Sequence, residues 1–456
     1  GVVMSKPVCL VTAPVATRSG YGAHSRDIVR ALIELDRYDV KIYNVRWGNT
    51  PMNALDTNDD NDKMIIERLL PTPHLPKQPE IHIHIVIPNE FQPIAKYNIG
   101  ITAGLETTAC PATWIEGLNR MNVNFVPSTF VKEVVEKTVF DIQDERTKQV
   151  TGELRTNKPI EVLFEGTDTN IYKKTTEFSP LLVDEMKKVD DTFNFLFVGH
   201  WLAGGLGKDR KDVGMLLKVF YETFKNDKRK PGLILKTSGA GFSVIDREAI
   251  LGKIESVKSG IKGELPNVYL MHGDFSDEQM NELYNHPKVK AHINLTHGEG
   301  FGRPLLESTM SKKPVIATDW SGHKDFLPKD LAILLQGHLT DVPKESFPKD
   351  MHINGAKWFT ANYQQTSAVM KDVFVNYKKY RINAEKLTMV NKSKFSLKQM
   401  TKDLGVLLDK YVPEFPKEVK LELPKLKKVG ASGAKGDTGD TKPPTPEMKL
   451  PKLKRV

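Results

Sequence analysis

Two glutamates on either side of a glycine turn are the residues of this sequence best placed to do chemistry. Glu299 and Glu307 stand eight positions apart in HGEGFGRPLLES, and Gly300-Phe301-Gly302 follows the first of them. Gly300 and Gly302 permit a close backbone approach to a ligand, and a helix over RPLLESTMS, with Glu307 at its start, would favour a bound phosphate. Carboxylates accept hydrogen bonds from hydroxyl groups. A diphosphate flanked by sugar hydroxyls fits this arrangement, and so does a tight turn whose glutamate only complements the helix dipole.

The surrounding sequence alternates apolar strand patterns with helical ones. KPVCLVTA, residues 6–13, predicts a buried strand, and SGYGAHSRDIVRALIEL predicts a glycine turn followed by a helix. The pattern restarts with FNFLFVGH near residue 193. Alternation of this kind is typical of helix-covered parallel sheets, whose ligands bind beyond the carboxyl ends of the strands. We therefore expect an α/β protein with two Rossmann-like domains and a site in the cleft between them.

The expected boundaries follow from these patterns and from the composition of the C-terminus. We expect an N-terminal domain at 1–175, a second domain at 176–365, closing helices at 366–411 and a tail at 412–456. The tail holds eleven Lys/Arg against six Asp/Glu, a large part of the net charge of +9. Because the tail supplies most of the net positive charge, the net charge gives little support for a nucleic-acid-binding groove on residues 1–411.

Composition narrows the class of protein. The chain has 456 residues, 39% of them hydrophobic and 27% charged, and no apolar run reaches the roughly 20 residues that span a bilayer. We expect no transmembrane segment and a cytoplasmic location. Cys9 and Cys110 each lie in an apolar segment, which favours buried, reduced thiols over a disulfide or a metal site.

The glutamate pair resembles the Glu-x7-Glu motif of family 4 glycosyltransferases, which are retaining enzymes of the GT-B fold. Four other segments occur in the family's order: VNFVPSTFVKEVV, VLFEGTDTNIY, FLFVGH with DRKDVGMLLKVF, and FSLKQMTKDL. The similarity covers roughly residues 6–411. It implies GT-B architecture, with two Rossmann-like domains facing each other across a cleft.

The resemblance also implies roles for individual residues. Glu299 would contact hydroxyls of a donor sugar, and Glu307 would contact the ribose of its nucleotide. Backbone amides around Phe301 and Gly302 would hold the diphosphate, with Lys211 as the neutralising cation and Arg210 as a weaker candidate.

Four residues depart from the family's pattern or allow two interpretations. His200 stands where the family often has arginine, followed by a longer loop, WLAGGLGKD. This histidine either replaces the arginine or is neutral and structural. Gly20 and Gly22 either approach the ligand or form a tight turn. Glu106, in GITAGLETT, is our candidate for a polar group at the reaction centre, with a surface capping role as the alternative.

Two clusters that could suggest a metal have plainer explanations. Asp60-Asn61-Asp62 has the Asp-x-Asp form of a metal-nucleotide site, but such clusters usually cap helices or bind water. His82 and His84 alternate in PEIHIHIVIP and so share one face of a strand, which a half-exposed strand would explain without a metal. We expect no metal site.

The predicted function is retaining transfer of a sugar from a UDP- or GDP-linked donor to an acceptor hydroxyl. The resemblance implies front-face substitution without a metal, and no cofactor beyond the donor. The acceptor stays open between a glycan, a protein and modified DNA. The alternative is a structural or interaction protein, virion-associated and anchored through the tail, which keeps the fold without turnover.

The tail carries two unusual elements. GASGAKGDTGDT, residues 430–441, forms four Gly-X-Y triplets, and the similar strings LPKLKKV and LPKLKRV lie on either side of it. The segment is either a flexible basic tether or a docking element for a protein partner or oligomer. Collagen-like triplets favour a phage-encoded protein, located in the host cytoplasm or on the virion.

Overall fold

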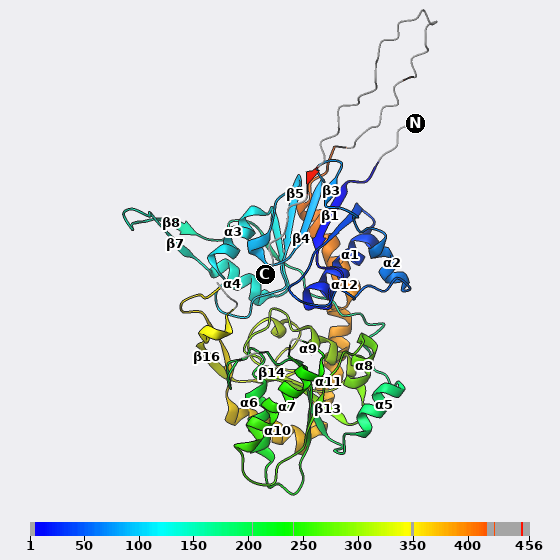
Figure 1. Cartoon of the computed structure of the whole chain (residues 1–456), viewed down its shortest axis with the longest axis vertical. Helices are drawn as coiled ribbons and strands as arrows, with labels where there is room; N and C mark the ends of the chain where they lie inside the picture. The colour runs from blue at the N-terminus through cyan, green and yellow to red at the C-terminus, as the bar shows by residue number, and fades with distance from the viewer. Residues whose placement is uncertain are drawn as a thin grey trace, which may run out of the picture.

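The computed structural model describes residues 5–202, 204–239, 241–347 and 351–416, together with Pro424 and Met448–Lys449. These residues form two α/β domains stacked along the long axis of the molecule, with the N-terminal domain uppermost in Figure 1. Each domain contains one six-stranded sheet. Within the described residues, no helix has both the length and the apolarity needed to cross a bilayer.

All neighbouring strands of the N-terminal sheet are parallel, in the order β2-β1-β4-β5-β6-β9. The strands are β1 (Val8–Ala13), β2 (Asp39–Asn44), β4 (Ile81–Ile85), β5 (Tyr97–Ile101), β6 (Val123–Val126) and β9 (Ile160–Val162). The helices of this region are α1 (Gly20–Leu35), α2 (Asp60–Ile66), the short η1 (Pro88–Glu90), α3 (Ala112–Arg120) and α4 (Thr129–Lys137).

The histidines of β4 correct one sequence expectation. His82 and His84 are both fully buried, because β4 lies inside the sheet and all five of its residues are covered. The expected half-exposed strand was therefore wrong. His82 Nε2 lies 2.8 Å from Thr12 Oγ1, and the amide of Gln92 donates to His84 Nδ1 at 3.2 Å. Burial lowers the pKa of His82 to about 4, so these rings are neutral core groups.

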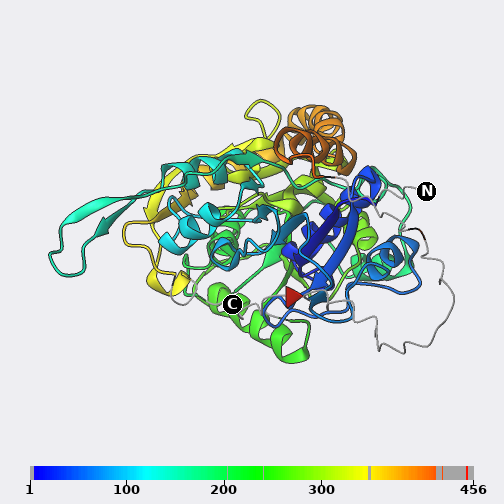
Figure 2. The same cartoon turned by 90° about the horizontal axis from the view of Figure 1, so that it is seen from above.

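Two small pairings are additions that the sequence did not predict. The hairpin β7 (Phe140–Gln143) and β8 (Val150–Leu154) projects from the N-terminal domain, as Figure 2 shows from above. The two-residue strand β3 (His74–Leu75) pairs antiparallel with β18 (Met448–Lys449). Of the predicted tail, residues 412–416 and Pro424 are also described. The remainder, including the Gly-X-Y triplets, the whole of LPKLKRV and all of LPKLKKV except Pro424, lies outside the described residues.

The second sheet is also parallel, in the order β12-β11-β10-β13-β14-β15. Its strands are β10 (Asn194–His200), β11 (Gly232–Ser238), β12 (Val268–Met271), β13 (Val289–Asn294), β14 (Val315–Thr318) and β15 (Ile333–Leu335). The chain progresses outward in one direction from β10 to β12 and in the other from β13 to β15. Ligands of open parallel sheets bind at such a reversal, here beyond the ends of β10 and β13.

Further elements cover and extend this sheet. They are α5 (Pro180–Lys187), α6 (Val213–Phe224), α7 (Val244–Ser259), α8 (Asp277–Asn285), α9 (Arg303–Ser308), η2 (Thr309–Ser311), η3 (Gly322–Asp325), β16 (Gly337–Asp341), η4 (Lys344–Ser346) and β17 (Lys357–Ala361). Strands β16 and β17 form an antiparallel pair that follows the sheet.

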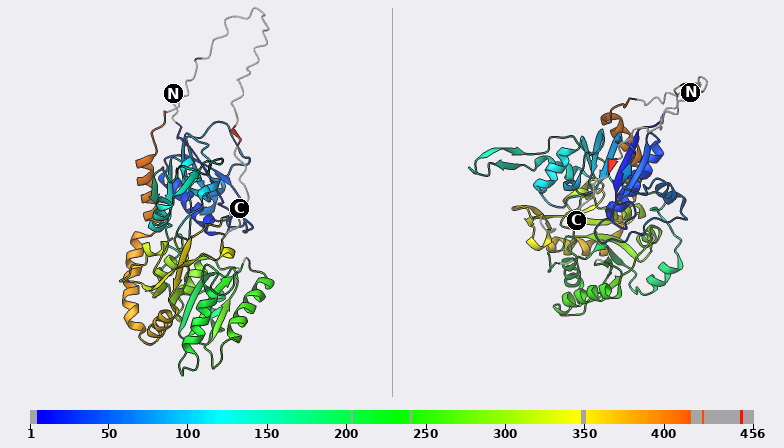
Figure 3. Two further views of the ribbon diagram at one scale, coloured as in Figure 1. Left: turned by 90° about the vertical axis from the view of Figure 1, so that its left-hand side faces the viewer. Right: turned by 45° about the horizontal axis from the view of Figure 1, so that its top comes forward.

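Three helices close the chain along one edge of the molecule, orange in the left-hand view of Figure 3. They are α10 (Tyr363–Val375), α11 (Tyr377–Lys394) and α12 (Leu397–Tyr411). Met400 and Leu404 of α12 belong to the apolar core of the N-terminal domain. The last helix thus returns to the first domain, and the chain crosses between the domains twice.

The two crossings are hydrogen-bonded to each other. The amide of Thr167 donates to Phe395 O at 2.8 Å, and the amide of Leu397 donates to Thr167 O at 2.9 Å. A side chain at Gly166 would overlap the backbone at Ser396 and Leu397, so glycine is required for this close packing. The crossings form a two-stranded hinge.

Candidate functional site

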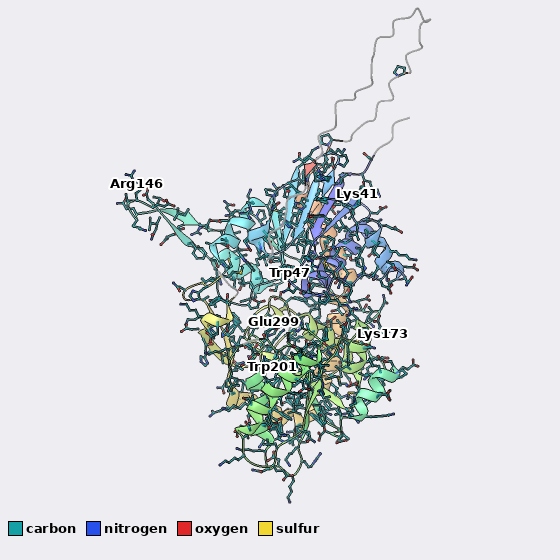
Figure 4. The ribbon with its side chains drawn as sticks, viewed as in Figure 1. Lys41, Trp47, Arg146, Lys173, Trp201 and Glu299 are labelled. Carbon is teal, nitrogen blue, oxygen red and sulfur yellow. The ribbon has the colours of Figure 1, made fainter. Side chains whose placement is uncertain are left out.

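Four of the sequence-predicted residues meet between the domains, where Figure 4 labels Glu299: Glu299, Arg210, Lys211 and Glu106. Glu299 lies in the loop after β13, while Arg210 and Lys211 lie in the loop after β10. Because β10 and β13 are neighbours at the reversal of strand order, these two loops leave the sheet side by side.

Glu299 is held by two cations. Lys211 Nζ donates to Glu299 Oε1, and Arg210 Nη1 donates to Glu299 Oε2 at 2.8 Å and to Gly298 O at 2.9 Å. Burial acts to raise the pKa of Glu299, but the charges of Arg210 and Lys211 lower it to about 2. Glu299 is therefore an ionised hydrogen-bond acceptor at neutral pH, and both cations contact its carboxylate directly.

Glu106 reaches the same cluster from the N-terminal domain. Its Oε1 lies 4.0 Å from Arg210 Nε, and its side chain is 40% exposed. The backbone of residues 103–106 also contacts the glycine turn directly: a side chain at Gly298 would overlap Glu106 O, and one at Gly300 would overlap residues 103–105. In this structure, the absence of a side chain at Gly300 therefore allows close packing against the N-terminal domain.

The turn continues into a helix shorter than predicted. Gly302 has φ 95° and forms the N-cap of α9, a left-handed conformation that favours glycine. Phe301 is buried and packs on Phe326, with ring centroids 4.9 Å apart, which anchors the turn in the domain core. The sequence predicts Glu307 at the start of this helix. Because α9 ends at Ser308, Glu307 lies in its last turn instead, and that prediction is wrong.

Glu307 is buried in a different electrostatic setting from Glu299. Burial raises the pKa of Glu307 to about 8, because the charge of Arg303 offsets the penalty only in part and Asp277 opposes ionisation. Arg303 Nε lies 3.9 Å from Glu307 Oε2, and Tyr172 lies beside the same carboxyl and donates to Asp277 Oδ1 at 2.9 Å. Glu307 is mainly protonated at neutral pH, so it can both donate and accept a hydrogen bond.

His200 is placed at the end of β10 but is not a cation. Burial and the charge of Lys211 lower its pKa, and its Nδ1 lies 3.3 Å from Ser238 Oγ. A neutral ring can still donate one N–H to an anion.

The two N-terminal glycines differ in their surroundings. A side chain at Gly22 would overlap Thr17 O, and its amide donates to the N-cap Ser19 Oγ at 2.9 Å, so the turn itself requires Gly22. Nothing lies within 4 Å of a Cβ built at Gly20. Of the two, Gly20 has the open space that a ligand contact needs.

The Asp-x-Asp sequence is occupied by local structure. Asp59 caps α2 by accepting from the amides of Asn61 and Asp62, and Asp62 Oδ1 accepts from Arg30 Nη2 at 2.6 Å. Over the described part of the chain, no group of three or more His, Cys, Asp or Glu side chains could hold a metal ion.

Sequence reasoning missed two groups that shape the site. Arg303 Nη2 donates to Asp27 Oδ2 of α1 at 2.7 Å and so links the domains. His297 directs Nδ1 at Phe359 O (2.7 Å) and Nε2 at Gly207 O (3.0 Å), so both nitrogens must donate. The only signal for either was its place inside HGEGFGRP.

Comparisons with known proteins agree with this fold. No family model matches the chain. The serotype-specific mannosyltransferase WbdA of Escherichia coli is 31% identical over 96 residues, which cover 19% of this chain and only 12% of WbdA. Sucrose-phosphate synthase from Thermosynechococcus elongatus has a TM-score of 0.55 at 11% identity, over 89% of this chain and 98% of that one.

Two further solved structures are similar over the same extent. A glycosyltransferase from Rickettsia africae has a TM-score of 0.56 at 15% identity, covering 89% of this chain and 98% of its own. Anabaena HepE in complex with UDP-glucose has a TM-score of 0.53 at 13% identity, covering 89% and 100%. The predicted GT-B architecture of two Rossmann-like domains is thereby confirmed.

Proposed function

We propose that the chain is a retaining, metal-independent glycosyltransferase that moves a sugar from a UDP- or GDP-linked donor to an acceptor hydroxyl. The observation that carries this proposal is the contact of Glu299 with Arg210 and Lys211 at the strand reversal of the second sheet. The GT-B fold shared with HepE, which was solved with UDP-glucose, supports a nucleotide-sugar donor.

Each charged group has a role in this proposal. The donor diphosphate lies against Lys211 and Arg210, which stabilise the negative charge that grows on the leaving nucleotide. Glu299 accepts hydrogen bonds from sugar hydroxyls. Glu307 binds the ribose, where a protonated carboxyl can donate to one hydroxyl oxygen and accept from another.

The proposed step is a front-face substitution. The acceptor oxygen forms a bond to the anomeric carbon on the face from which the diphosphate departs, the bond from that carbon to the phosphate oxygen breaks, and the acceptor proton passes to a phosphate oxygen. Glu106 borders this region. The acceptor is a glycan, a protein or modified DNA.

Thermal melting with a panel of UDP- and GDP-sugars tests the donor. A cognate donor at about 100 times its Kd stabilises the folded chain by about 2.7 kcal/mol, and we expect this shift to persist in chelator. Lys211→Ala should abolish most of the shift and slow donor hydrolysis. A chain that binds no nucleotide sugar, or hydrolyses it only with added metal, contradicts the proposal.

A further inference from the structure

Helix α11 presents an outer face unlike that of any neighbouring helix. It contains six Lys/Arg and one Glu in 18 residues. Its exposed residues include Lys378, Lys379, Arg381, Lys386, Lys392 and Lys394. This face lies on the edge formed by the orange helices in Figure 3.

Apolar side chains lie among these cations at a regular spacing. On α11, Ile382 is 59% exposed and Met389 65%, and the two are seven residues apart; Val375, the last residue of α10, is 73% exposed. Seven residues are close to two helical turns, so Ile382 and Met389 fall on one line along α11. Lys386 stands between them in sequence, four residues after Ile382 and three before Met389.

The positive charge of this face is only partly neutralised. Lys379 pairs with Asp372 at 2.7 Å, and Arg381 pairs with Glu385 at 3.3 Å. Within the part of the chain that the structure describes, Lys378, Lys386 and Lys392 form no ion pair.

Neighbouring segments add to the same charge. Burial lowers the pKa of Lys174, and the positive charges of Arg381 and Lys312 lower it further. Lys313 contributes little to this charge, because its Nζ donates to His286 O and Val289 O, and its pKa falls to about 7, first through burial and then through Lys174, Lys290 and Arg381. A bound anion would relieve this repulsion.

We propose that the outer face of α11 docks on the surface of an anionic lipid bilayer. Lysines flanking a line of exposed apolar residues match such a surface, because the cations meet the acidic headgroups while Ile382 and Met389 enter the boundary below them. Nucleic acid would satisfy the cations but would leave these apolar side chains in water.

Helix α7 provides a matched comparison within the same domain. Val244 and Ile245 at its start are 76% and 83% exposed, more than any apolar residue of α11. However, α7 carries three Lys/Arg and three Asp/Glu in 16 residues. If exposed apolar area alone determined docking, α7 would be the docking helix; if charge complementarity also counts, α11 is.

Vesicle sedimentation of the full chain tests the proposal, with phosphatidylcholine vesicles compared with vesicles holding 30% phosphatidylglycerol at ~0.1 M salt. We expect binding to the anionic vesicles only. K378E/K386E/K392E should weaken it at least ~100-fold, about 5-fold per lysine, and I382S/M389S by ~10-fold. Two controls should bind like the parent: V244S/I245S, and K218E/K258E/K262E, which makes the same charge change at exposed lysines elsewhere.

Several results would overturn the proposal. They are binding to neutral vesicles as tight as to anionic ones, no binding to either, or loss of binding in the α7 variant but not in the α11 variant. Undiminished binding by K378E/K386E/K392E would also overturn it and assign binding to the lysine-rich tail. Concentration-dependent dimers that this variant abolishes, without vesicle binding, would make the face a self-association surface. Donor hydrolysis without vesicles should be equal in all variants, so this proposal and the proposed function fail independently.

Discussion

Replacing Glu307 by Gln should make the folded chain more stable, and increasingly so as the pH rises from 5 to 7. The pKa of Glu307 is raised by burial from its ordinary value of 4.5 to about 8. The unfolded chain therefore releases this proton at a lower pH than the folded chain does. The stabilising contribution of the protonated carboxyl is complete below pH 4.5 and is lost as the pH rises toward 8.

The size of the effect follows from the separation of the two pKa values. At about 1.4 kcal/mol per pKa unit, the advantage of Glu307→Gln over the parent is about 1 kcal/mol at pH 5 and about 3 kcal/mol at pH 7. For a chain of this length, each kcal/mol of added stability raises Tm by roughly 1 °C. Glutamine keeps the shape of the protonated side chain, so packing should be conserved.

Calorimetric melting of both proteins at pH 5, 6 and 7 measures this difference. Glu278→Gln, at an exposed position of α8, serves as the control for the same substitution outside the buried site. A constant difference between Glu307→Gln and the parent across the range would refute the reasoning. It would mean that Arg303 keeps Glu307 ionised in the folded state.

The other predictions concern ligand binding, domain contact and the tail. Glu307→Ala should weaken the affinity for plain UDP or GDP about tenfold, whereas Glu299→Ala should chiefly lower turnover; equal losses of nucleotide affinity in calorimetric titration would contradict these roles. Gly300→Val should hold the domains apart, because its side chain would overlap residues 103–105. We expect a larger radius of gyration in X-ray scattering and at least tenfold slower turnover, and an unchanged radius would speak against the contact. Truncation after Tyr411 should leave sugar transfer intact and remove a partner or a higher oligomer, as activity and light scattering on the shortened chain will reveal.

Sequence patterns predicted the parallel sheets because alternation of buried strands and helices is a local property of the chain. The meeting of Glu299 with Lys211 was also accessible, since the resemblance located both loops. The Arg303 to Asp27 contact was not, because 276 positions separate the two residues and no local pattern pairs them. The burial of His82 and His84 was misjudged for a related reason: their own strand cannot indicate that both faces of the sheet are covered.

The two-stranded hinge limits how the domains can move. The hydrogen bonds of Thr167 to Phe395 and Leu397 would survive a bend about a line across both crossings, whereas sliding one crossing past the other would break them. A domain opening of this kind would be close to a single rotation, and closing it would bring residues 103–106 back to the same glycines of the turn. A motion with one degree of freedom needs no search for register, so the groups from both domains would reassemble in one geometry each time the domains close.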